Sequence, residues 1–331
     1  MDIKILFRRG VSALFIAAIL LINAVTHAEV FTAEGTYVMS EFETLYIAKE
    51  RAKAVALRSA AEQARRYVTS YAAGNNFNLD SDSAELIAVN VIKSAAEPKF
   101  KVKNMTIRVT VKAQIDDSDI APWLYRNLHE NIIQYKALRR GEDKQAKSID
   151  DLKRQPADTP QDKEQLAPKF AEADKIFLSH QKLHDALKLY NKGDFDGTIR
   201  LCDEAIALNP QYNFSYNNRA LALIGLEQYE QAIKDFDTSI RLNPSCFNAY
   251  NNRGAVYRRL NQYEKALDDH TNAIKIKPDF DDLYFNRGVD YYCLGEYERA
   301  IADFDKALEL KPNCTQAEEY RERCLRALGK L

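Results

Sequence analysis

Residues 250–278 read YNNRGAVYRRLNQYEKALDDHTNAIKIKP, and residues 284–312 read YFNRGVDYYCLGEYERAIADFDKALELKP. The two stretches share tyrosine, asparagine, arginine, glycine and proline positions at an interval of 34 residues. A period of that length marks a supersecondary unit that buries its apolar face only by stacking on its neighbours. The sequence therefore predicts an array of helix pairs in the C-terminal half of the chain.

The same period gives four copies of this unit and a shorter remnant. The copies are residues 179–212, 213–246, 247–280 and 281–314, and the remnant is 315–331. The eighth and twentieth positions are small in three or four copies, the seventeenth is aromatic, and the thirty-second is always proline. Proline cannot continue a helix, so each one ends the second helix of its pair.

These landmarks resemble the tetratricopeptide repeat family, and the resemblance covers residues 179–331. It implies antiparallel helix pairs stacked into a right-handed superhelix with a concave, peptide-binding surface. The first copy departs from the pattern at Lys182 and Thr198. We therefore expect a degenerate capping copy whose first helix starts near Pro168, and an amphipathic closing helix at 315–331. The predicted repeat domain is 168–331.

The N-terminus has the order of a secretory signal peptide. Three basic residues precede an apolar run at 11–25, and small residues follow at 26 and 28. The run is short for a membrane span, which needs about 20 residues. We expect a signal peptide at 1–28, cleaved after Ala28, and an exported, periplasmic protein. The alternative is an uncleaved signal that tethers the chain to the inner membrane.

Residues 29–138 show alternating strand and helix patterns. Alanine recurs at every fourth position between 48 and 64, which allows a helix to approach a sheet closely. The predicted elements are strands at 30–40 and 104–115 and helices at 43–71, 84–95 and 118–138. This order predicts a small α+β domain. Its opening resembles the N-terminal modules of some bacterial envelope proteins, including a flagellar accessory protein and short outer-membrane lipoproteins, which implies a role in envelope assembly.

Residues 139–167 have few apolar side chains, dense mixed charge and two prolines. A segment of this composition buries too little surface to fold on its own. We therefore expect a flexible charged linker between the two domains.

The remaining composition excludes several classes of function. The net charge is −1, and no segment has the concentrated positive charge of a nucleic-acid binder. No nucleophile elbow, phosphate-binding loop or zinc-protease motif is present, so we expect no enzyme, cofactor or metal. His180 and His184 lie four residues apart on one face of a predicted helix, which is the spacing of two metal ligands. No third ligand is apparent in the sequence, and the alternative is that the pair is simply solvated. Of the five cysteines, Cys293 and Cys324 form the one pair that merits a disulfide test.

The sixth position of the unit is asparagine in the last three copies: Asn218, Asn252 and Asn286. In the family this position faces the concave surface. An amide side chain both donates and accepts, so a row of them can hold the backbone of an extended peptide. Similar rows occur in the repeat domains of a nucleocytoplasmic sugar transferase and the peroxisomal import receptor. We expect the row to be exposed in the unliganded protein; the alternative is that it is only family consensus.

Other residues at concave positions complete the predicted groove. Phe214, Phe285 and Tyr292 are candidate apolar pockets beside the row, and Arg258 and Arg259 are candidate contacts for acidic residues. The cations that a two-carboxylate clamp requires are missing from the corresponding positions, which disfavours that type of groove.

A second periodic set consists of arginine at the seventh position and aspartate at the twenty-third. The arginines are Arg219, Arg253 and Arg287, and the aspartates are Asp235, Asp269 and Asp303. The first copy has neither the arginine nor the aspartate at these two positions. We interpret this set as a structural ladder of ion pairs, within copies or between neighbours.

The sequence as a whole predicts an exported, non-enzymatic adaptor or scaffold that binds protein or extended-peptide partners in the groove. The module at 29–138 indicates a role in envelope protein assembly, and membrane contact is expected only through the signal segment. The alternatives are a structural component of an envelope machine and an enzyme whose site lies in 29–138.

Overall fold

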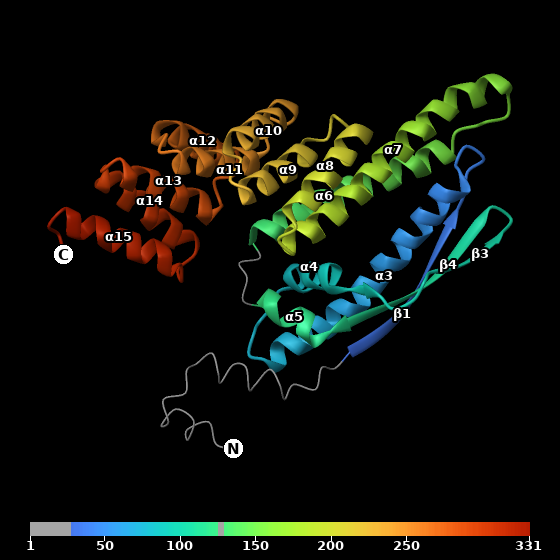
Figure 1. The fold of residues 1–331 in the computed structure, drawn as a ribbon, viewed down its shortest axis with the longest axis horizontal. Helices are drawn as coiled ribbons and strands as arrows, with labels where there is room; N and C mark the ends of the chain where they lie inside the picture. The colour runs from blue at the N-terminus through green and yellow to red at the C-terminus, as the bar shows by residue number, and fades with distance from the viewer. Residues whose placement is uncertain (1–27, 125–128) are drawn as a thin grey trace, which may run out of the picture. The chain divides into compact units, whose positions relative to one another are not determined.

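The computed structural model describes residues 28–124 and 129–331 (Figure 1). The chain divides into two compact units. The first takes in the chain up to 139 together with 155–170, and the second takes in 140–154 together with 171–331. The predicted signal peptide, except for Ala28, lies outside the described residues. No helix within the described ranges is long and apolar enough to cross a membrane.

The first unit has the predicted α+β character. Its elements are β1 (Ala28–Val38), α3 (Leu45–Gly74), α4 (Ser81–Val91), β2 (Lys93–Ser94), β3 (Lys99–Lys103), β4 (Thr106–Asp116) and α5 (Asp117–Leu124). The predicted strands and the first two predicted helices are present, whereas the predicted helix at 118–138 falls on α5 and on a later helix that starts at His129, with 125–128 outside the described residues. The strands β2 and β3 were missed. The strand β3 alternates lysine with Phe100 and Val102, which is the pattern of a half-exposed strand, but it spans only five residues. Asn104 and Met105, with φ of 48° and 59°, form the two-residue turn from β3 to β4.

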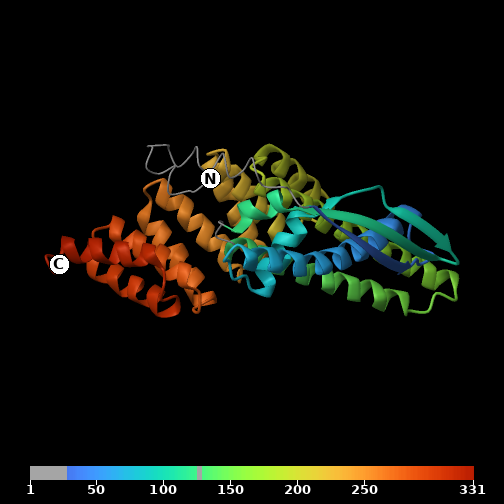
Figure 2. The same cartoon turned by 90° about the horizontal axis from the view of Figure 1, so that it is seen from below.

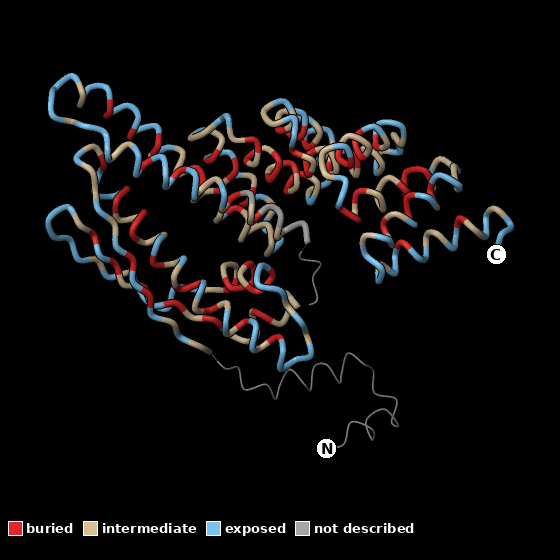
Figure 3. The backbone as a smooth tube through the Cα atoms, turned by 180° about the vertical axis from the view of Figure 1, so that it is seen from behind, coloured by how far each residue is buried: buried red, intermediate tan, exposed pale blue. Residues whose placement is uncertain are grey.

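The strand β4 lies at the centre of an antiparallel sheet. It pairs with β1 along one edge, and with β2 and β3 in succession along the other. The long helix α3 lies along one face of this sheet (Figure 1, Figure 2). The predicted alanine ridge is confirmed, because Ala48, Ala52, Ala56 and Ala60 are fully buried against it. Figure 3 shows these buried positions recurring along α3.

Gly35 sets the distance between β1 and α3. A Cβ atom at this position would lie 2.3 Å from the carbonyl oxygen of Ala52 and 2.7 Å from the amide nitrogen of Ala56. Both of these atoms belong to the backbone, so they cannot rotate away. Any larger residue would have to separate the strand from the helix.

The prediction of a flexible linker at 139–167 is wrong. Most of this segment belongs to two helices, α6 (His129–Lys153) and α7 (Pro160–Asn191). Within the second unit, Gln145 and Ile149 of α6 are buried, and the amide of Gln145 donates to the carbonyl oxygen of Ala173. A few buried residues at helical spacing are enough to dock a helix whose average composition is polar.

The start of α7 also has a local cause. The Thr159 hydroxyl accepts from the Asp162 backbone nitrogen at 3.1 Å, and the Asp162 carboxylate accepts from the Thr159 nitrogen at 3.1 Å. This is a capping box, and Pro160 occupies the first helical position that proline favours. The helix therefore starts eight residues before Pro168, which is accommodated inside it.

The second unit contains the predicted array. The end of α7 and the helix α8 (Phe195–Leu208) form the first copy, and the next six helices form three further pairs. These are α9 (Asn213–Gly225), α10 (Tyr229–Leu242), α11 (Phe247–Arg259), α12 (Tyr263–Ile276), α13 (Asp281–Cys293) and α14 (Tyr297–Leu310), and α15 (Thr315–Ala327) follows them. Each of the four prolines follows a helix end by one or two residues. The helix α15 is the predicted closing helix.

The arginine–aspartate ladder links helices both within and between copies. Arg219 on α9 forms a bidentate ion pair with Asp235 on α10, with both nitrogen–oxygen distances at 2.7 Å. Its third nitrogen donates to Asp203 on α8 at 2.5 Å. The same geometry recurs where Arg253 binds Asp269 and Asp237, and where Arg287 binds Asp303 and Thr271. The hydrogen bonds to Asp235 raise the pKa of Arg219 above its ordinary value.

We predict that Arg253→Ala lowers the free energy of unfolding by about 3 kcal/mol, because it leaves Asp269, only 4% exposed, without its partner. Arg321 is the matched control: it binds Asp305 in a pair whose side chains are 39% and 52% exposed, so Arg321→Ala should cost less than about 1 kcal/mol. Urea unfolding of the two variants measures the difference. Equal losses would contradict a structural role for the buried ladder.

We also predict that Gly35→Ala destabilises the first unit by about 1–3 kcal/mol, because the new methyl group overlaps backbone atoms of α3. Gly74→Ala is the control, since a Cβ there meets no atom within 4 Å and alanine favours a helix. Thermal unfolding of both variants checks this. A Gly35→Ala protein as stable as the Gly74→Ala protein would show that β1 and α3 are not in close contact.

Candidate functional site

The asparagine row lies on the first helices of the last three copies, as predicted, but it is not exposed. Asn218 on α9 is 5% exposed, Asn252 on α11 is 6% exposed, and Asn286 on α13 is half-buried. The expectation of solvent-exposed side chains is therefore wrong.

Two members of the row keep unused hydrogen-bonding capacity. The Nδ2 of Asn218 donates to the Phe214 carbonyl oxygen at 2.9 Å, and its Oδ1 has no partner. The Oδ1 of Asn252 accepts from Asn251 at 3.5 Å, and its Nδ2 has no partner. The neighbouring Asn217 is fully buried, with neither side-chain polar atom paired. Three buried amides, two on α9 and one on α11, thus have atoms without the partners that a buried amide normally has.

Asn286 has a different role, because both ends of its amide are used inside the protein. Its Nδ2 donates to Asn251 Oδ1 at 3.0 Å, and its Oδ1 accepts from Arg258 at 3.1 Å. Arg258 also donates to the Asn286 carbonyl oxygen at 3.1 Å. These contacts join α11 to α13, so Asn286 holds two copies together.

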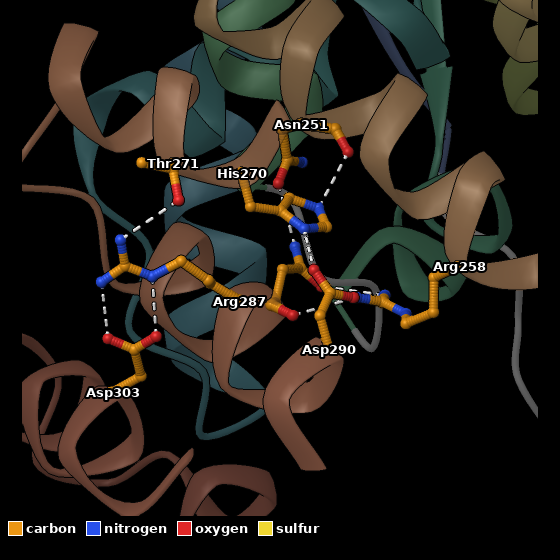
Figure 4. Close-up of polar contacts among 8 residues, drawn as sticks. Asn251, Arg258, His270, Thr271, Arg287, Asp290 and Asp303 are labelled. Atoms are coloured by element: carbon orange, nitrogen blue, oxygen red, sulfur yellow. Dashed lines mark hydrogen bonds and ion pairs between the residues drawn. The ribbon is translucent and has the colours of Figure 1, made fainter. Parts of the chain in front are cut away.

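Arg258 reaches a buried acidic group that the sequence did not indicate. It donates to Asp290 Oδ1 at 3.1 Å, and the other carboxylate oxygen of Asp290 contacts His270 Nδ1 (Figure 4). His270 and Asp290 are fully buried. The remaining ring nitrogen of His270 lies 3.2 Å from the Asn251 carbonyl oxygen. One connected polar cluster therefore spans α11, α12 and α13.

Comparison of the copies could have revealed this cluster. His270 occupies a position that is Phe236 and Phe304 in the neighbouring copies, and Asp290 occupies a position that is Ala222 and Val256. Both residues of this contact are therefore polar at positions where the neighbouring copies have apolar residues. The cluster is not a catalytic pair, because His270 is buried and its second nitrogen is already bonded within the protein.

The predicted apolar pockets belong largely to the packing around the closing helix. Phe285 lies 5.8 Å and Tyr292 lies 5.4 Å, ring centre to ring centre, from Tyr320 of α15. Phe214 is half-buried beside Tyr212, 5.5 Å between ring centres. Arg259, by contrast, is exposed and makes a single long hydrogen bond to the Tyr229 hydroxyl.

The helix α6 lies against the part of the first copy that was predicted to line the groove. Glu142 contacts His184 at 3.3 Å, and a Cβ on Gly141 would lie 2.9 Å from the Tyr212 hydroxyl and 3.3 Å from the His180 ring. Burial lowers the pKa of His180 and raises that of Tyr212. Although Glu142 lies near the histidines, no cluster of three or more potential metal ligands occurs among the described residues.

The five thiols are unpaired in this structure, including Cys293 and Cys324. Burial raises the pKa of Cys202 to about 12 and raises that of Cys246 and Cys324. A raised pKa keeps a thiol protonated and unreactive, so these three residues serve as small core side chains. Cys293 is exposed, and the structure does not join it to Cys324.

Comparison with curated protein sequences gives no significant match. Among solved structures, a crystal structure of MamA protein is 22% identical with a TM-score of 0.43, covering 46% of this chain and 84% of its own. The first repeat domain of Spaghetti (RPAP3), bound to the HSP90 peptide SRMEEVD, is 24% identical with a TM-score of 0.35, covering 36% and 94%. A tetratricopeptide repeat protein from Parabacteroides merdae is 21% identical with a TM-score of 0.42, covering 46% and 60%.

The family model for the tetratricopeptide repeat matches residues 214–246, 247–280 and 282–314. The degenerate first copy is not among these matches. The array that carries the asparagine row and the arginine–aspartate ladder therefore belongs to the tetratricopeptide repeat family.

Proposed function

We propose that this protein is an adaptor whose repeats hold an extended peptide from a partner protein along α9 and α11. Repeats of this family form protein-interaction scaffolds, and no part of the described structure points to catalysis. The first copy is covered by α6, so the proposed groove starts at the second copy.

The observation that carries this proposal is the group of unpaired amides at Asn217, Asn218 and Asn252. A buried polar atom without a partner costs about 1–3 kcal/mol. A peptide backbone offers alternating donors and acceptors, so it can satisfy an unpaired oxygen on α9 and an unpaired nitrogen on α11 together. Because these atoms have little contact with water, the asparagines must rotate toward the ligand to bind it.

We further propose that the protein works outside the cytoplasm, in the assembly of envelope proteins. The charge and hydropathy order of residues 1–28 supports export. The α+β module at 29–138 supports the envelope role through its resemblance to other envelope modules.

For the groove, we predict that Asn218→Ala combined with Asn252→Ala weakens peptide binding about 5- to 100-fold, since each lost hydrogen bond contributes about 0.5–1.5 kcal/mol. Peptides selected from a random library on the wild-type chain serve as ligands, and calorimetry at fixed salt measures their affinity. The double variant should stay folded, because the two substitutions remove two unpaired amide atoms, Asn218 Oδ1 and Asn252 Nδ2, from the core.

The matched control is Asn286→Ala, which removes an asparagine at the same position of the next copy. It should lower the melting temperature instead, because it breaks the bonds to Asn251 and Arg258. Unchanged peptide affinity in the double variant would contradict the proposed backbone contact and leave the row a packing feature only.

The export proposal predicts that the mature protein begins at Glu29. N-terminal sequencing of protein from the native cell checks this. An intact Met1 in a membrane fraction would instead support the uncleaved tether.

A further inference from the structure

The outer face of the sheet in the first unit is strongly basic. Strand pairing places residues opposite one another on the same face, so Lys101 lies across from Arg108, and Arg108 across from Thr36. The exposed cations of this face are Lys99, Lys101, Lys103, Arg108 and Lys112. Like charges in adjacent strands repel one another, so stability of the sheet does not account for this arrangement.

These five cations are not neutralised by the protein. None of them forms an ion pair within the described ranges, whereas Lys93, on the same edge of the sheet, contacts Asp116 and Asp119. Glu34 is the acidic residue closest to them in the strand register, opposite Thr110. The face therefore presents concentrated positive charge although the whole chain carries a net charge of −1.

Exposed apolar side chains gather at the end of the same sheet. Val38 is 58% exposed, Val102 is 50% exposed and Met105 is 42% exposed. Val38 ends β1, and the next residue donates its amide to the Met105 carbonyl oxygen at 2.7 Å. The turn from β3 to β4 and the end of β1 thus form one tip. Tyr46, 64% exposed, stands at the start of α3, which follows this tip in the chain.

We propose that this face and its tip bind the surface of a bilayer that contains anionic lipids. Lysines and arginines gain energy from the negative potential of such a surface. Aliphatic and tyrosine side chains gain from the boundary between headgroups and acyl chains. The face has no aromatic residue on which nucleic-acid bases could stack, which favours lipid over a single-stranded nucleic acid. The site is independent of the repeat groove.

The test uses the full chain with phosphatidylcholine vesicles, prepared with or without phosphatidylglycerol. We expect amide hydrogen exchange at residues 99–112 to slow only with phosphatidylglycerol and to recover at high salt. A local measurement is needed because the apolar N-terminal segment can bind any vesicle. Equal protection by both vesicle types, or no protection, would overturn the proposal.

Charge-matched variants separate this face from general attraction. The Lys99→Gln, Lys101→Gln, Lys103→Gln protein should lose the protection, with its apparent affinity for the anionic vesicles at the hairpin reduced about 100-fold. The control carries Lys144→Gln, Lys192→Gln and Lys234→Gln, which remove the same charge from exposed sites of the second unit and should leave the protection unchanged. Equal loss in both proteins would overturn the proposal. Stronger protection by duplex DNA or polyglutamate than by the vesicles would also overturn it.

Discussion

Close approach of backbones at small residues is the constraint on which both units depend. In the first unit, Gly35 lets β1 touch the backbone of α3, where alanine occupies each fourth position. In the second, Gly254 faces the ring of His270 and Gly288 faces the ring of Phe304, each with space for no more than a hydrogen. Helices that approach this closely bring buried charges within bonding distance of their partners. The arginine–aspartate forks join the two helices of each copy, and the third nitrogen of each arginine contacts the preceding copy.

The features that were predictable from the sequence are those tied to a repeated or alternating pattern. Proline at one interval located the helix ends, and alanine at every fourth position located the buried face of α3. The parts of α6 and α7 that lie within 139–167 were missed because the prediction for this segment relied on average composition. Their docking depends on spacing: Gln145 and Ile149 lie one turn apart, and Thr159 and Asp162 form the cap. Composition does not record either relation.

The candidate groove was predicted less well than the fold, for a physical reason. Equivalent positions in a repeat have equivalent directions, but they do not have equivalent partners. Asn218 and Asn252 keep unpaired atoms, whereas Asn286 is bonded to Asn251 and Arg258 because Asp290 draws Arg258 toward α13. One difference between copies, the aspartate at position 290, thus changes an asparagine of the same copy from a candidate ligand contact into a structural link. Position within the unit alone could not distinguish the two roles.

The net charge of the chain is a sum over all residues, so it does not describe the charge of any one surface. The repeats carry many charges, and the arginines and aspartates of the ladder bind one another across α9 to α14. The first unit places Lys99, Lys101, Lys103, Arg108 and Lys112 on one face of its sheet, and none of these five is in an ion pair within the described ranges. A partner responds to the local potential and not to the total, so a net charge of −1 is compatible with a strongly basic surface. The balanced composition excludes a chain that is basic throughout, but it says nothing against one basic face.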